Sequence, residues 1–595
     1  MRTAYGPTVI GISALFHDAA CCVLRNGELV AAAEEERFTR IKHDPSLPFN
    51  AFRYCLDEAG ITLPDVDCIA FYEVPHKKLG RQLWASLPNV PLATPEAFSR
   101  LNSQRAQRDI RTIFGFEGRL EFVEHHLSHA ASSFFYSGFS EAAVLTVDGV
   151  GEWATTTYGV GRGSALDLFE EVCFPDSIGI LYSTVTSYLG FEVNEAEYKV
   201  MGLAPYGKPK YVDKIWRLLE NRSQGQFALD LTFFDFFRGE RMYSDALVEL
   251  FGEPARLPES TIAPFHQDVA KSLQVVLEEF LLTKAKYLSD RVGSENLCMA
   301  GGVALNCVAN GRILRDGPFR HMFVQPAAGD AGAALGAAAI AHIRLTGERP
   351  TNRELTHVYL GPSYTSEDIH ALVRGTGISV EDCRSSVDEL IAKTASHLAH
   401  GRVVGWFQGR TEFGPRALGS RSILADPRDP TMRDKINAQV KKRESFRPFA
   451  PSVLADRASE HFDLDQPSPF MLQICQVRSQ ISLPAITHVD GSARVQTVSE
   501  EDNPLFARLL KEFEQRTGCP ILLNTSFNLR GEPIVMTPVD AFSTFVRSDI
   551  DVLVLGDFLI KRDIVTPFML ELGEIYTLAH RETRLAVSEL AYTFI

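Results

Sequence analysis

Several common sequence features are missing from this chain of 595 residues, and each absence excludes something. The ten cysteines are scattered and form no CxxC pair, so we predict reduced, mostly structural thiols and not a disulfide framework. No segment fits GxxxxGK[ST], which excludes a P-loop nucleotide site. Basic residues are not in excess: the net charge of −15 argues against a general nucleic-acid or anionic-membrane binder, although it allows a local basic site.

Long apolar runs are also lacking. The most apolar segment, AAGDAGAALGAAAIA at 327–341, is interrupted by Asp330 and is too short to cross a bilayer. The N-terminal MRTAYGPTVIGIS has no hydrophobic signal region and no cleavage site. We therefore expect a cytoplasmic protein.

What is present predicts an α/β protein of two or more domains. The length exceeds what one hydrophobic core usually serves, and 45% hydrophobic with 23% charged residues is typical of a globular chain. Residues 8–16 predict one strand and residues 20–36 predict two more, with a hairpin turn at Asn26-Gly27. A related pattern returns at 142–160, which predicts a duplicated architecture.

Helical patterns alternate with strands in the rest of the chain. Residues 265–292 predict an amphipathic helix. A domain boundary is predicted at the polar, proline- and glycine-bearing segment 346–355. Beyond it, residues 387–401 predict a helix closed by Gly401, followed by a strand at 402–409.

The segment EHHLSHAASSFF places His125 and His129 four residues apart in a predicted helix. Imidazoles at i and i+4 share one helical face, as a metal site requires. On a helical wheel both lie nearly opposite the apolar Leu127, Ala131 and Phe134. Two partly exposed helix histidines are the simpler interpretation, because a metal needs further ligands.

Two aspartates are candidates for those ligands. Asp148 ends the strand VLTVD, where an acidic side chain can face a cleft. Asp330 precedes a helix in PAAGDAGAA, where a helix N-cap is the alternative. Two histidines with two carboxylates suit iron, manganese or zinc.

Glycine-rich turns follow several of the predicted strands. In a duplicated α/β chain such turns can hold phosphate as actin-like ATPases do, although a tight turn explains each one taken alone. The residues are Gly149 and Gly151 in DGVGE, Gly202 in MGLAPYGK, and Gly301, Gly302 and Asn306 in MAGGVALN.

Residues 402–447 carry eleven Lys and Arg against five Asp and Glu, within an acidic protein. Because the basic side chains alternate with Gly, Pro and Phe, we predict ligands for phosphate oxygens, with a solvated basic face as the alternative. The candidates are Arg410, Arg416, Arg421, Lys441 and Arg447, together with Asn524, Ser526 and Asn528 in LLNTSFNLRGEP. His17 in ALFHDAA follows a strand tip, where a satisfied turn histidine is the simpler interpretation.

Together these segments resemble the O-carbamoyltransferases of nodulation-factor and antibiotic biosynthesis, the nodulation, cephalosporin and tobramycin group. The resemblance covers essentially the whole chain. It rests on ten ordered motifs: FHDAA, AAAEEERFTRIKH, HHLSHAASSFF, LTVDGVGEW, EYKVMGLAPYG, AGGVALN, PAAGDAGAALGAA, GRTEFGPRALGSRSIL, KKRESFRPFAP and LLNTSFNLRGEPIV.

The resemblance implies an N-terminal domain at 1–352, similar to the TsaD-like tRNA threonylcarbamoyl transferases with an actin-like ATPase fold, and a C-terminal YrdC-like domain at 353–595. In the family the two histidines of HxxxH and two aspartates hold a metal, usually iron. Those positions here are His125, His129, Asp148 and Asp330. The family histidine thought to assist deprotonation of the acceptor matches His17, and the C-terminal basic set with the NTSFN turn matches the carbamoyl phosphate site.

The implied reaction has two stages. Carbamoyl phosphate and ATP, with Mg²⁺, give carbamoyl-adenylate and pyrophosphate, and the carbamoyl group then passes to a hydroxyl of a small natural-product acceptor. Lys42 and His43 in FTRIKHD are interpreted as contacts to the adenylate or the acceptor, with a surface loop as the alternative. No nucleic-acid or membrane partner is expected, and a homodimer is left open.

Three other functions compete with this prediction. A tRNA threonylcarbamoyl-type enzyme predicts a broad basic surface, against which the acidic balance speaks. An inactive actin-like nucleotide-binding scaffold predicts missing ligands, and none of the residue types is missing. A carbamoyl-dependent maturation factor for metalloenzymes would normally carry CxxC zinc motifs.

Overall fold

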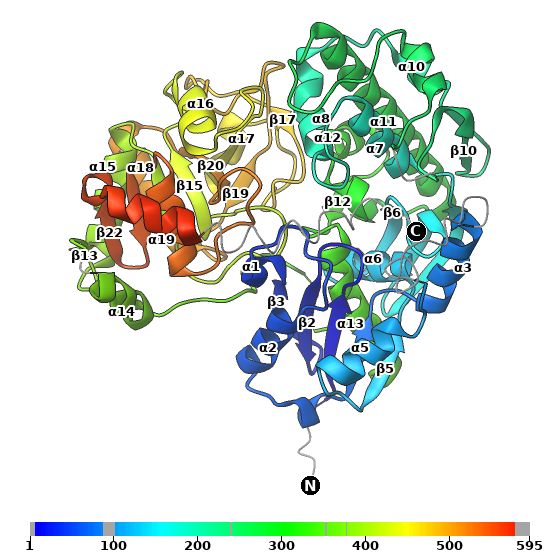
Figure 1. The fold of residues 1–595 in the computed structure, drawn as a ribbon, viewed down its shortest axis with the longest axis horizontal. Coiled ribbons are helices and arrows are strands. Elements are labelled where there is room, and N and C mark those ends of the chain that lie inside the picture. Colours follow the sequence, from blue (N-terminus) through cyan, green and yellow to red (C-terminus); the bar gives the residue numbers. More distant parts are fainter. Residues whose placement is uncertain (1–5, 87–100, 238–240, 352–353, 377, 577–595) are drawn as a thin grey trace. The chain divides into compact units, whose positions relative to one another are not determined.

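The computed structural model describes residues 6–86, 101–237, 241–351, 354–376 and 378–576 (Figure 1). The described chain forms two compact units: unit 1 contains 6–35 and 43–355, and unit 2 contains 36–42 and 356–576. The boundary predicted at 352/353 falls on residues outside the described ones, and the chain passes from unit 1 to unit 2 after Leu355. The early excursion of 36–42 into unit 2 was not predicted from the sequence.

Unit 1 is built on two five-stranded sheets with the same strand order. In each sheet three consecutive strands form an antiparallel meander, and two later strands continue the sheet in parallel from the first strand of the meander. The first sheet contains β1 (Thr8–Ser13), β2 (Ala20–Arg25), β3 (Glu28–Glu34), β4 (Cys68–Phe71) and β5 (Arg119–Phe122). The second contains β6 (Glu141–Val147), β7 (Ala154–Arg162), β8 (Ala165–Cys173), β11 (Asn296–Ala300) and β12 (His321–Val324). The predicted α/β duplication is therefore present.

Local sequence explains the first hairpin. Asn26 and Gly27 join β2 to β3 with φ values of 55° and 79°. Two consecutive positive φ angles define a type I′ turn, whose twist matches that of the strands, and Asn-Gly is the dipeptide that tolerates it best. The predicted hairpin is confirmed.

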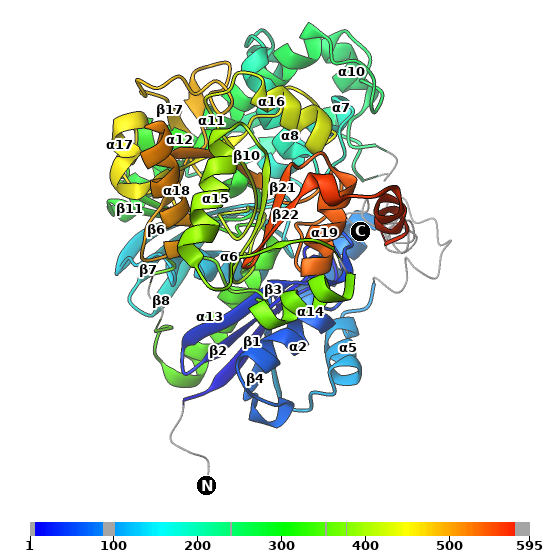
Figure 2. The same ribbon diagram turned by 90° about the vertical axis from the view of Figure 1, so that its left-hand side faces the viewer.

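Two helices rich in small residues, α6 (His125–Phe134) and α13 (Asp330–Thr346), pack tightly together in unit 1. Helix α13 also lies across β1 and β2 (Figure 2). The packing leaves no room for larger residues: a Cβ on Gly336 would lie 1.7 Å from the carbonyl oxygen of Ser128. This close approach brings the first residues of both helices toward one point.

Other helices cover the sheets of unit 1. The predicted helix at 265–292 is observed as α11 (Pro264–Val292), which begins with Pro at its first position and ends before the left-handed Gly293. The remaining helices of unit 1 are α2 (Phe49–Glu58), α3 (Pro75–Ser86), α5 (Arg105–Ile113), α7 (Ile178–Tyr188), α8 (Glu197–Leu203), α9 (Val212–Trp216), α10 (Asp245–Phe251) and α12 (Cys307–Asp316). Among the described helices, none combines the length and apolar character needed to cross a membrane.

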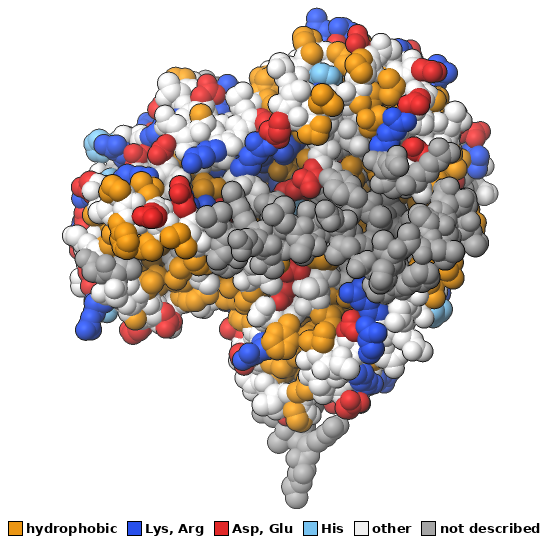
Figure 3. All heavy atoms as spheres, in the orientation of Figure 1, with side chains coloured by type: hydrophobic (Ala, Val, Ile, Leu, Met, Phe, Trp, Pro, Cys, Tyr) orange, Lys and Arg blue, Asp and Glu red, His pale blue; other side chains and the backbone are white. Residues whose placement is uncertain are grey.

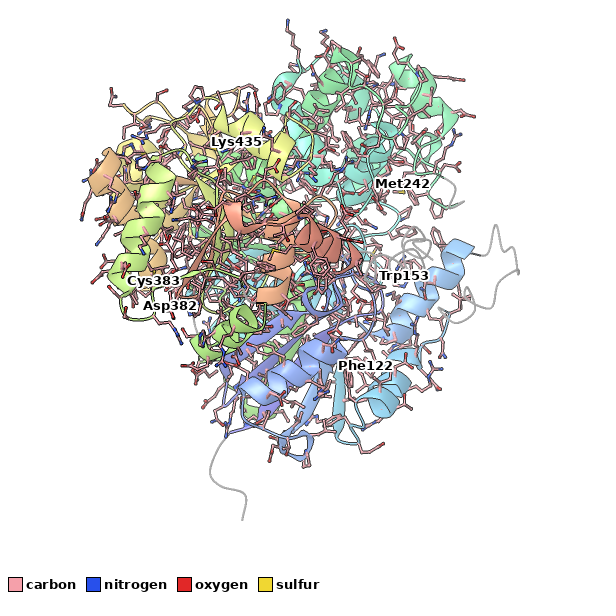
Figure 4. All side chains as sticks on the ribbon, turned by 60° about the vertical axis from the view of Figure 1, so that its left-hand side comes forward. Phe122, Trp153, Met242, Asp382, Cys383 and Lys435 are labelled. Carbon is pink, nitrogen blue, oxygen red and sulfur yellow. The ribbon has the colours of Figure 1, made fainter. Side chains whose placement is uncertain are left out.

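Unit 2 is built on one mixed sheet of eight strands, in the order β13-β22-β21-β14-β15-β20-β16-β19. Its strands are β13 (Glu381–Asp382), β14 (Val404–Phe407), β15 (Arg421–Ala425), β16 (Ala450–Leu454), β19 (Gln496–Val498), β20 (Ile521–Ser526), β21 (Val552–Leu555) and β22 (Phe558–Lys561). Its helices are α1 (Glu36–Thr39), α14 (Ser366–Thr376), α15 (Val387–Ala399), α16 (Met432–Lys435), α17 (Ala458–His461), α18 (Pro504–Thr517) and α19 (Pro538–Arg547). Figure 4 marks Asp382 at the edge strand β13 and Lys435 at the end of α16.

The second-unit predictions hold. The helix expected at 387–401 is α15, and Gly401 follows its end with a φ of 71°. The strand expected after it is β14. All ten cysteines are free and nine are buried, in agreement with the structural role predicted for them. On the face shown in Figure 3, basic and acidic side chains of the described residues are interspersed.

Candidate functional site

Four predicted metal ligands converge in unit 1. Each of these residues offers one ligand atom, a histidine nitrogen or a carboxylate oxygen, and the four atoms all lie within 4.8 Å of one another. The residues are His125, His129, Asp148 and Asp330. Nε2 of His125 lies 3.0 Å from Nε2 of His129, and Oδ2 of Asp148 lies 2.9 and 3.2 Å from these two atoms. Oδ1 of Asp330 lies 3.6 Å from each of the same nitrogens. The simpler interpretation, two partly exposed histidines, is wrong, because both side chains are buried.

Each ligand is positioned by the end of a regular element. His125 begins α6 and His129 lies one turn later, Asp148 directly follows β6, and Asp330 begins α13. The side chain of Asp330 does not cap its helix, so the N-cap alternative does not describe it. Helix ends and a strand end are rigid supports, which is what a site of fixed geometry requires.

The charges of this cluster fit a divalent cation. Two neighbouring carboxylates, that of Asp330 buried and that of Asp148 half-buried, would be costly without a compensating positive charge. Burial by itself lowers the pKa of His129, yet the hydrogen bonds and charges of Asp148 and Asp330 raise that pKa to about 9. A proton on His129 therefore supplies the positive charge that a metal ion would supply when bound. Nδ1 of both His125 and His129 is buried without a hydrogen-bond partner among the described residues, so the bonds orienting these rings come from their Nε2 atoms alone.

Sequence reasoning missed two supporting residues. The buried carboxylate of Glu152 accepts hydrogen bonds from the backbone N–H groups of Val74 and His125, and so holds the first residue of α6. The hydroxyl of Tyr72 donates to Oδ2 of Asp330 across 3.4 Å. Glu152 stands only four residues after Asp148 in DGVGEW, which is a signal that the sequence did contain.

The glycine turns near the cluster differ in what they contribute. Gly301 has a φ of 94°, and the N–H of Gly302 donates to Oδ1 of Asp148 across 3.0 Å. Gly151 packs on the ring of His125, since a Cβ there would lie 3.0 Å from its Cδ2. Gly149 faces open space. These four glycines surround Asp148 and His125, and their predicted nucleotide contact stays a prediction.

Replacing Gly301 with alanine is expected to lower the free energy of unfolding by about 2–4 kcal/mol, because a positive φ and a backbone clash are combined. A Cβ at this position would lie 2.3 Å from the carbonyl oxygen of Val147. The matched control is Gly149→Ala, whose Cβ meets nothing within 4 Å. Thermal melting followed by circular dichroism measures both, and equal melting temperatures would contradict the expectation.

Gly202 and Asn306 lie on other helices of unit 1. Gly202 is buried within α8. Asn306 caps α12 by accepting from the N–H of Ala309, and its amide pairs in both directions with that of Gln274. These bonds engage both ends of the Asn306 amide, and a nucleotide contact by either residue stays a prediction.

His17 belongs to a second arrangement beside the ligands. Its Nδ1 lies 3.0 Å from Oδ2 of Asp18 and 3.8 Å from Oδ2 of Asp330. The other oxygen of Asp18 lies 2.6 Å from Nδ1 of His43. Asp18 thus joins two histidines, one of which borders the metal cluster. Burial lowers the pKa of His17, but Asp330 and Asp18 outweigh it and raise that pKa to about 10.

The basic set in unit 2 separates into residues with different partners. The buried ammonium of Lys441 donates to both oxygens of Ser526 at 2.7 and 3.2 Å, and to both oxygens of Asn528 at 2.9 and 2.6 Å. Burial lowers the pKa of Lys441 well below its usual value, and the neighbouring charges of Arg443 and Arg447 lower it further. We call these five residues the Lys441 cluster. Lys441 has no carboxylate partner within the described part of the chain, so the cluster is suited to an anion.

Two of the predicted phosphate ligands instead hold the backbone. The fully buried guanidinium of Arg421 donates to the carbonyls of Gln408, Pro362, Gly409 and Ser420, and stacks 3.7 Å from the centre of the Phe407 ring. Arg410 donates to the carbonyls of Leu360 and Gly361. These bonds shape the 408–421 loop, and phosphate contacts by Arg410, Arg416 and Arg421 stay predictions.

Asn524 is buried beneath the same loop. Its Nδ2 atom donates to the carbonyl of Ala417, to Oγ of Ser452 and to Oε1 of Gln496. A carboxylate missed by sequence reasoning completes the loop: one oxygen of Glu412 accepts from the N–H groups of Leu418, Ser420 and Arg421. The structure therefore brings Ser526 and Asn528 to Lys441, while Asn524 supports the loop above β20.

Comparison with known proteins gives a consistent result. Residues 8–339 match the family model described as carbamoyltransferase N-terminus, and residues 395–562 match the carbamoyltransferase C-terminus. The nodulation protein NolNO of Sinorhizobium fredii is 42% identical over 93% of this chain and 80% of its own length. An uncharacterized protein of Synechocystis, sll1178, is 46% identical over 93% of this chain and 96% of its own length.

A shorter match has a named acceptor. The 3′-hydroxymethylcephem-O-carbamoyltransferase of Amycolatopsis lactamdurans is 39% identical over 44% of this chain and 48% of its own length. Among solved structures, HypF of T. kodakarensis matches 59% of this chain and 50% of its own length at 13% identity, with a TM-score of 0.33. That score is too low for structural inference.

Proposed function

This chain belongs to the carbamoyltransferase family, and from that premise we propose that it is an ATP-dependent O-carbamoyltransferase acting through carbamoyl-adenylate. Unit 2 would convert carbamoyl phosphate and ATP to the adenylate, and unit 1 would transfer the carbamoyl group to an alcohol. Under this proposal unit 1 has the actin-like, TsaD-like fold and unit 2 the YrdC-like fold. The single observation that supports it is the occurrence, in a chain of this family, of two histidines and two aspartates whose ligand atoms converge, and of the separate Lys441 cluster.

The activation step needs what the Lys441 cluster offers. Water hydrolyses carbamoyl phosphate to carbamate and inorganic phosphate. An oxygen of the carbamate then attacks the α-phosphorus of ATP, and pyrophosphate leaves. Every participant is an anion, so desolvated cations lower the barrier by attracting charge that spreads over the phosphoryl oxygens. Arg447 supplies such charge, and Lys441 supplies it when a bound anion offsets the burial that lowers its pKa. Ser526 and Asn528 present the hydroxyl and amide groups that can hydrogen-bond a planar carbamoyl group.

The transfer step is proposed to take place at the cluster of unit 1. His125, His129, Asp148 and Asp330 would hold a divalent metal, with iron as the proposed ion, which would polarise the carbamoyl carbonyl or a phosphate oxygen. Asp18 orients His17 through its carboxylate, so the imidazole has a fixed direction beside the cluster. The proposed acceptor is a small-molecule alcohol, in keeping with the hydroxymethyl group in the name of the Amycolatopsis relative.

The charges around His17 affect its proposed role as a base. An imidazole with its ordinary pKa accepts a proton readily at neutral pH. With a pKa of about 10, His17 is protonated there and cannot. His17 can take a proton from the acceptor only when the charge of Asp330 is engaged elsewhere, as it would be in ligating a cation. The proposed base role of His17 therefore depends on an occupied ligand cluster.

Pyrophosphate release tests the proposed function. The purified full chain is given ATP, carbamoyl phosphate and Mg²⁺ without an acceptor, and the metal content of the same sample is measured. We expect pyrophosphate only when carbamoyl phosphate is present. Its absence from folded, metal-containing protein, both alone and with candidate alcohols, would overturn the proposal in favour of an inactive nucleotide-binding scaffold.

Replacing His17 with asparagine should separate the two steps. We expect carbamoyl transfer to fall by about a hundred- to ten-thousandfold, the range of general-base catalysis, while pyrophosphate release in unit 2 continues. Product formation with an accepted alcohol and pyrophosphate release are measured on the same preparation. Equal losses in both would remove the base role from His17.

A further inference from the structure

The segment Glu36–Lys42 belongs to unit 2, although the residues on both sides of it belong to unit 1. It contains the short helix α1 and ends at Lys42, one of the residues predicted to contact the nucleotide. A chain that leaves one unit for only seven residues needs contacts to hold it in the other. Two arginines of this segment make them.

Arg37 binds the middle of the 408–421 loop, at Gly414. Its Nη2 donates to the carbonyl of Gly414 across 2.7 Å, and its Nη1 donates to Oε1 of Glu36 across 2.7 Å. The guanidinium is buried. A charged group hydrogen-bonded to a backbone carbonyl in a buried setting is a strong and specific anchor.

Arg40 makes three contacts with one short stretch of unit 2. Its Nη1 and Nη2 donate to the carbonyls of Ile534 and Pro533 across 2.6 and 2.8 Å. Its Nε lies 3.4 Å from Oδ1 of Asp540. The fork of the guanidinium therefore grips two consecutive carbonyls and a carboxylate at once, which a lysine cannot do.

Asp540 is itself held in place. It forms a capping box with Thr537 at the start of α19 and accepts from the hydroxyl of Tyr576. The carboxylate is almost fully buried; burial alone would raise its pKa, and the charge of Arg40 with the cap bonds lowers it below the usual value. The carboxylate is ionised at neutral pH and is a fixed counter-charge for Arg40.

The backbone turns at the residue that is anchored. Arg40 closes α1 with a hydrogen bond from its N–H to the carbonyl of Glu36, and its own φ is 60°. A left-handed conformation is unfavourable for an arginine and persists only where its surroundings enforce it. The contacts of Arg40 provide that enforcement, and the turn sets the direction in which the chain continues to Lys42.

Lys42 lies two residues after Arg40, whose partner Pro533 directly follows Glu532, and the carbonyl of Glu532 accepts from Nδ2 of Asn528 in the Lys441 cluster across 2.6 Å. The charge of Lys42 also lowers the pKa of Lys441, in the same sense as Arg443 and Arg447. Like charges repel, so a lysine on an unanchored segment would move away from this cluster before an anion binds. We propose that Arg40 is a positioning residue, which through Asp540 and the carbonyls of Pro533 and Ile534 holds Lys42 at the Lys441 cluster.

This inference rests on the proposed function, since the anion is taken to be carbamoyl phosphate. It is tested by steady-state pyrophosphate release from full-length variants with carbamoyl phosphate varied. For Arg40→Ala and for Lys42→Ala we expect KM for carbamoyl phosphate to rise by about tenfold or more, with a smaller change in kcat. The control is Arg53→Ala, an exposed arginine of α2 in unit 1, for which we expect wild-type values.

The double variant decides the mechanism. If Arg40 acts only by placing Lys42, Arg40→Ala combined with Lys42→Ala raises KM no further than Lys42→Ala alone. Multiplied effects would overturn the inference, because Arg40 would then act independently of Lys42. A normal KM for either single variant would overturn it as well.

Two further measurements keep folding and function apart. Thermal melting of Arg40→Ala and of Arg40→Lys shows whether the fold is intact, and we expect Arg40→Lys to raise KM less than Arg40→Ala while melting near wild type. A KM rise that follows the loss of melting temperature across the two variants would make Arg40 merely structural. Failure of the wild-type chain to release carbamoyl phosphate-dependent pyrophosphate would refute the proposed function instead, which is a distinct result.

Discussion

Replacing His129 with alanine is expected to prevent the metal binding that we propose for the four-residue cluster of unit 1, and so to lower carbamoyl transfer strongly. The variant removes one of two imidazole ligands and leaves the carboxylates of Asp148 and Asp330 facing each other with a single histidine. Loss of Lewis-acid stabilisation of several kcal/mol corresponds to a fall in transfer of about a hundred- to a thousandfold or more. Pyrophosphate release should stay within about twofold of wild type, because we propose that this step takes place in unit 2.

Metal content by mass spectrometry and product formation are measured together. The matched control is His126→Asn: His126 is the buried neighbour whose Nδ1 bonds to Oγ1 of Thr146, and asparagine can keep that bond. Asp148→Asn, which keeps the shape of the side chain, serves if His129→Ala melts early. Full metal content and full transfer in both His129→Ala and Asp148→Asn would remove these residues from the proposed metal site.

Replacing Lys441 with methionine should stop the activation step. Methionine keeps the length of the side chain but removes the amino group that joins Ser526 to Asn528 and that we propose to bind the substrate anion. Removing one preorganised donor from charge that develops in a reaction typically reduces kcat by about a hundred- to a thousandfold. The melting temperature should change little, since burying methionine avoids the desolvation that the ammonium requires.

Lys442→Met is the matched control. Lys442 is exposed, and its one described bond is a long contact of 3.4 Å to the carbonyl of Arg547. We expect wild-type pyrophosphate release from this variant. Similar losses at both positions would show that net charge in the segment matters rather than the placement of Lys441.

The proposed metal site was predicted in part from the sequence. The i, i+4 spacing of His125 and His129 is a local property, and the four ligand types were all assigned from motifs. Whether the two histidines were exposed could not be decided locally. Their burial depends on α13 packing onto α6, where Gly336 meets the backbone of Ser128 across a sequence distance of about two hundred residues.

The partners of the basic side chains in 402–447 could not be predicted from the sequence. Arg410, Arg421 and Lys441 looked equivalent, because each is a cation of the same basic segment, 402–447. In the structure the two arginines donate hydrogen bonds to backbone carbonyls, whereas Lys441 donates to Ser526 and Asn528. A side chain's partners are fixed by the folding of distant strands, and composition carries no information about them.

By itself the sequence determined the features that depend on neighbouring residues. The hairpin at Asn26-Gly27, the long helix α11, the duplicated strand pattern and the family followed from turn chemistry, periodicity and ordered motifs. Only the tertiary structure decided that Glu36–Lys42 belongs to unit 2, because Arg40 and its partner Ile534 are 494 residues apart. Contacts of that separation arise only when the whole chain has folded.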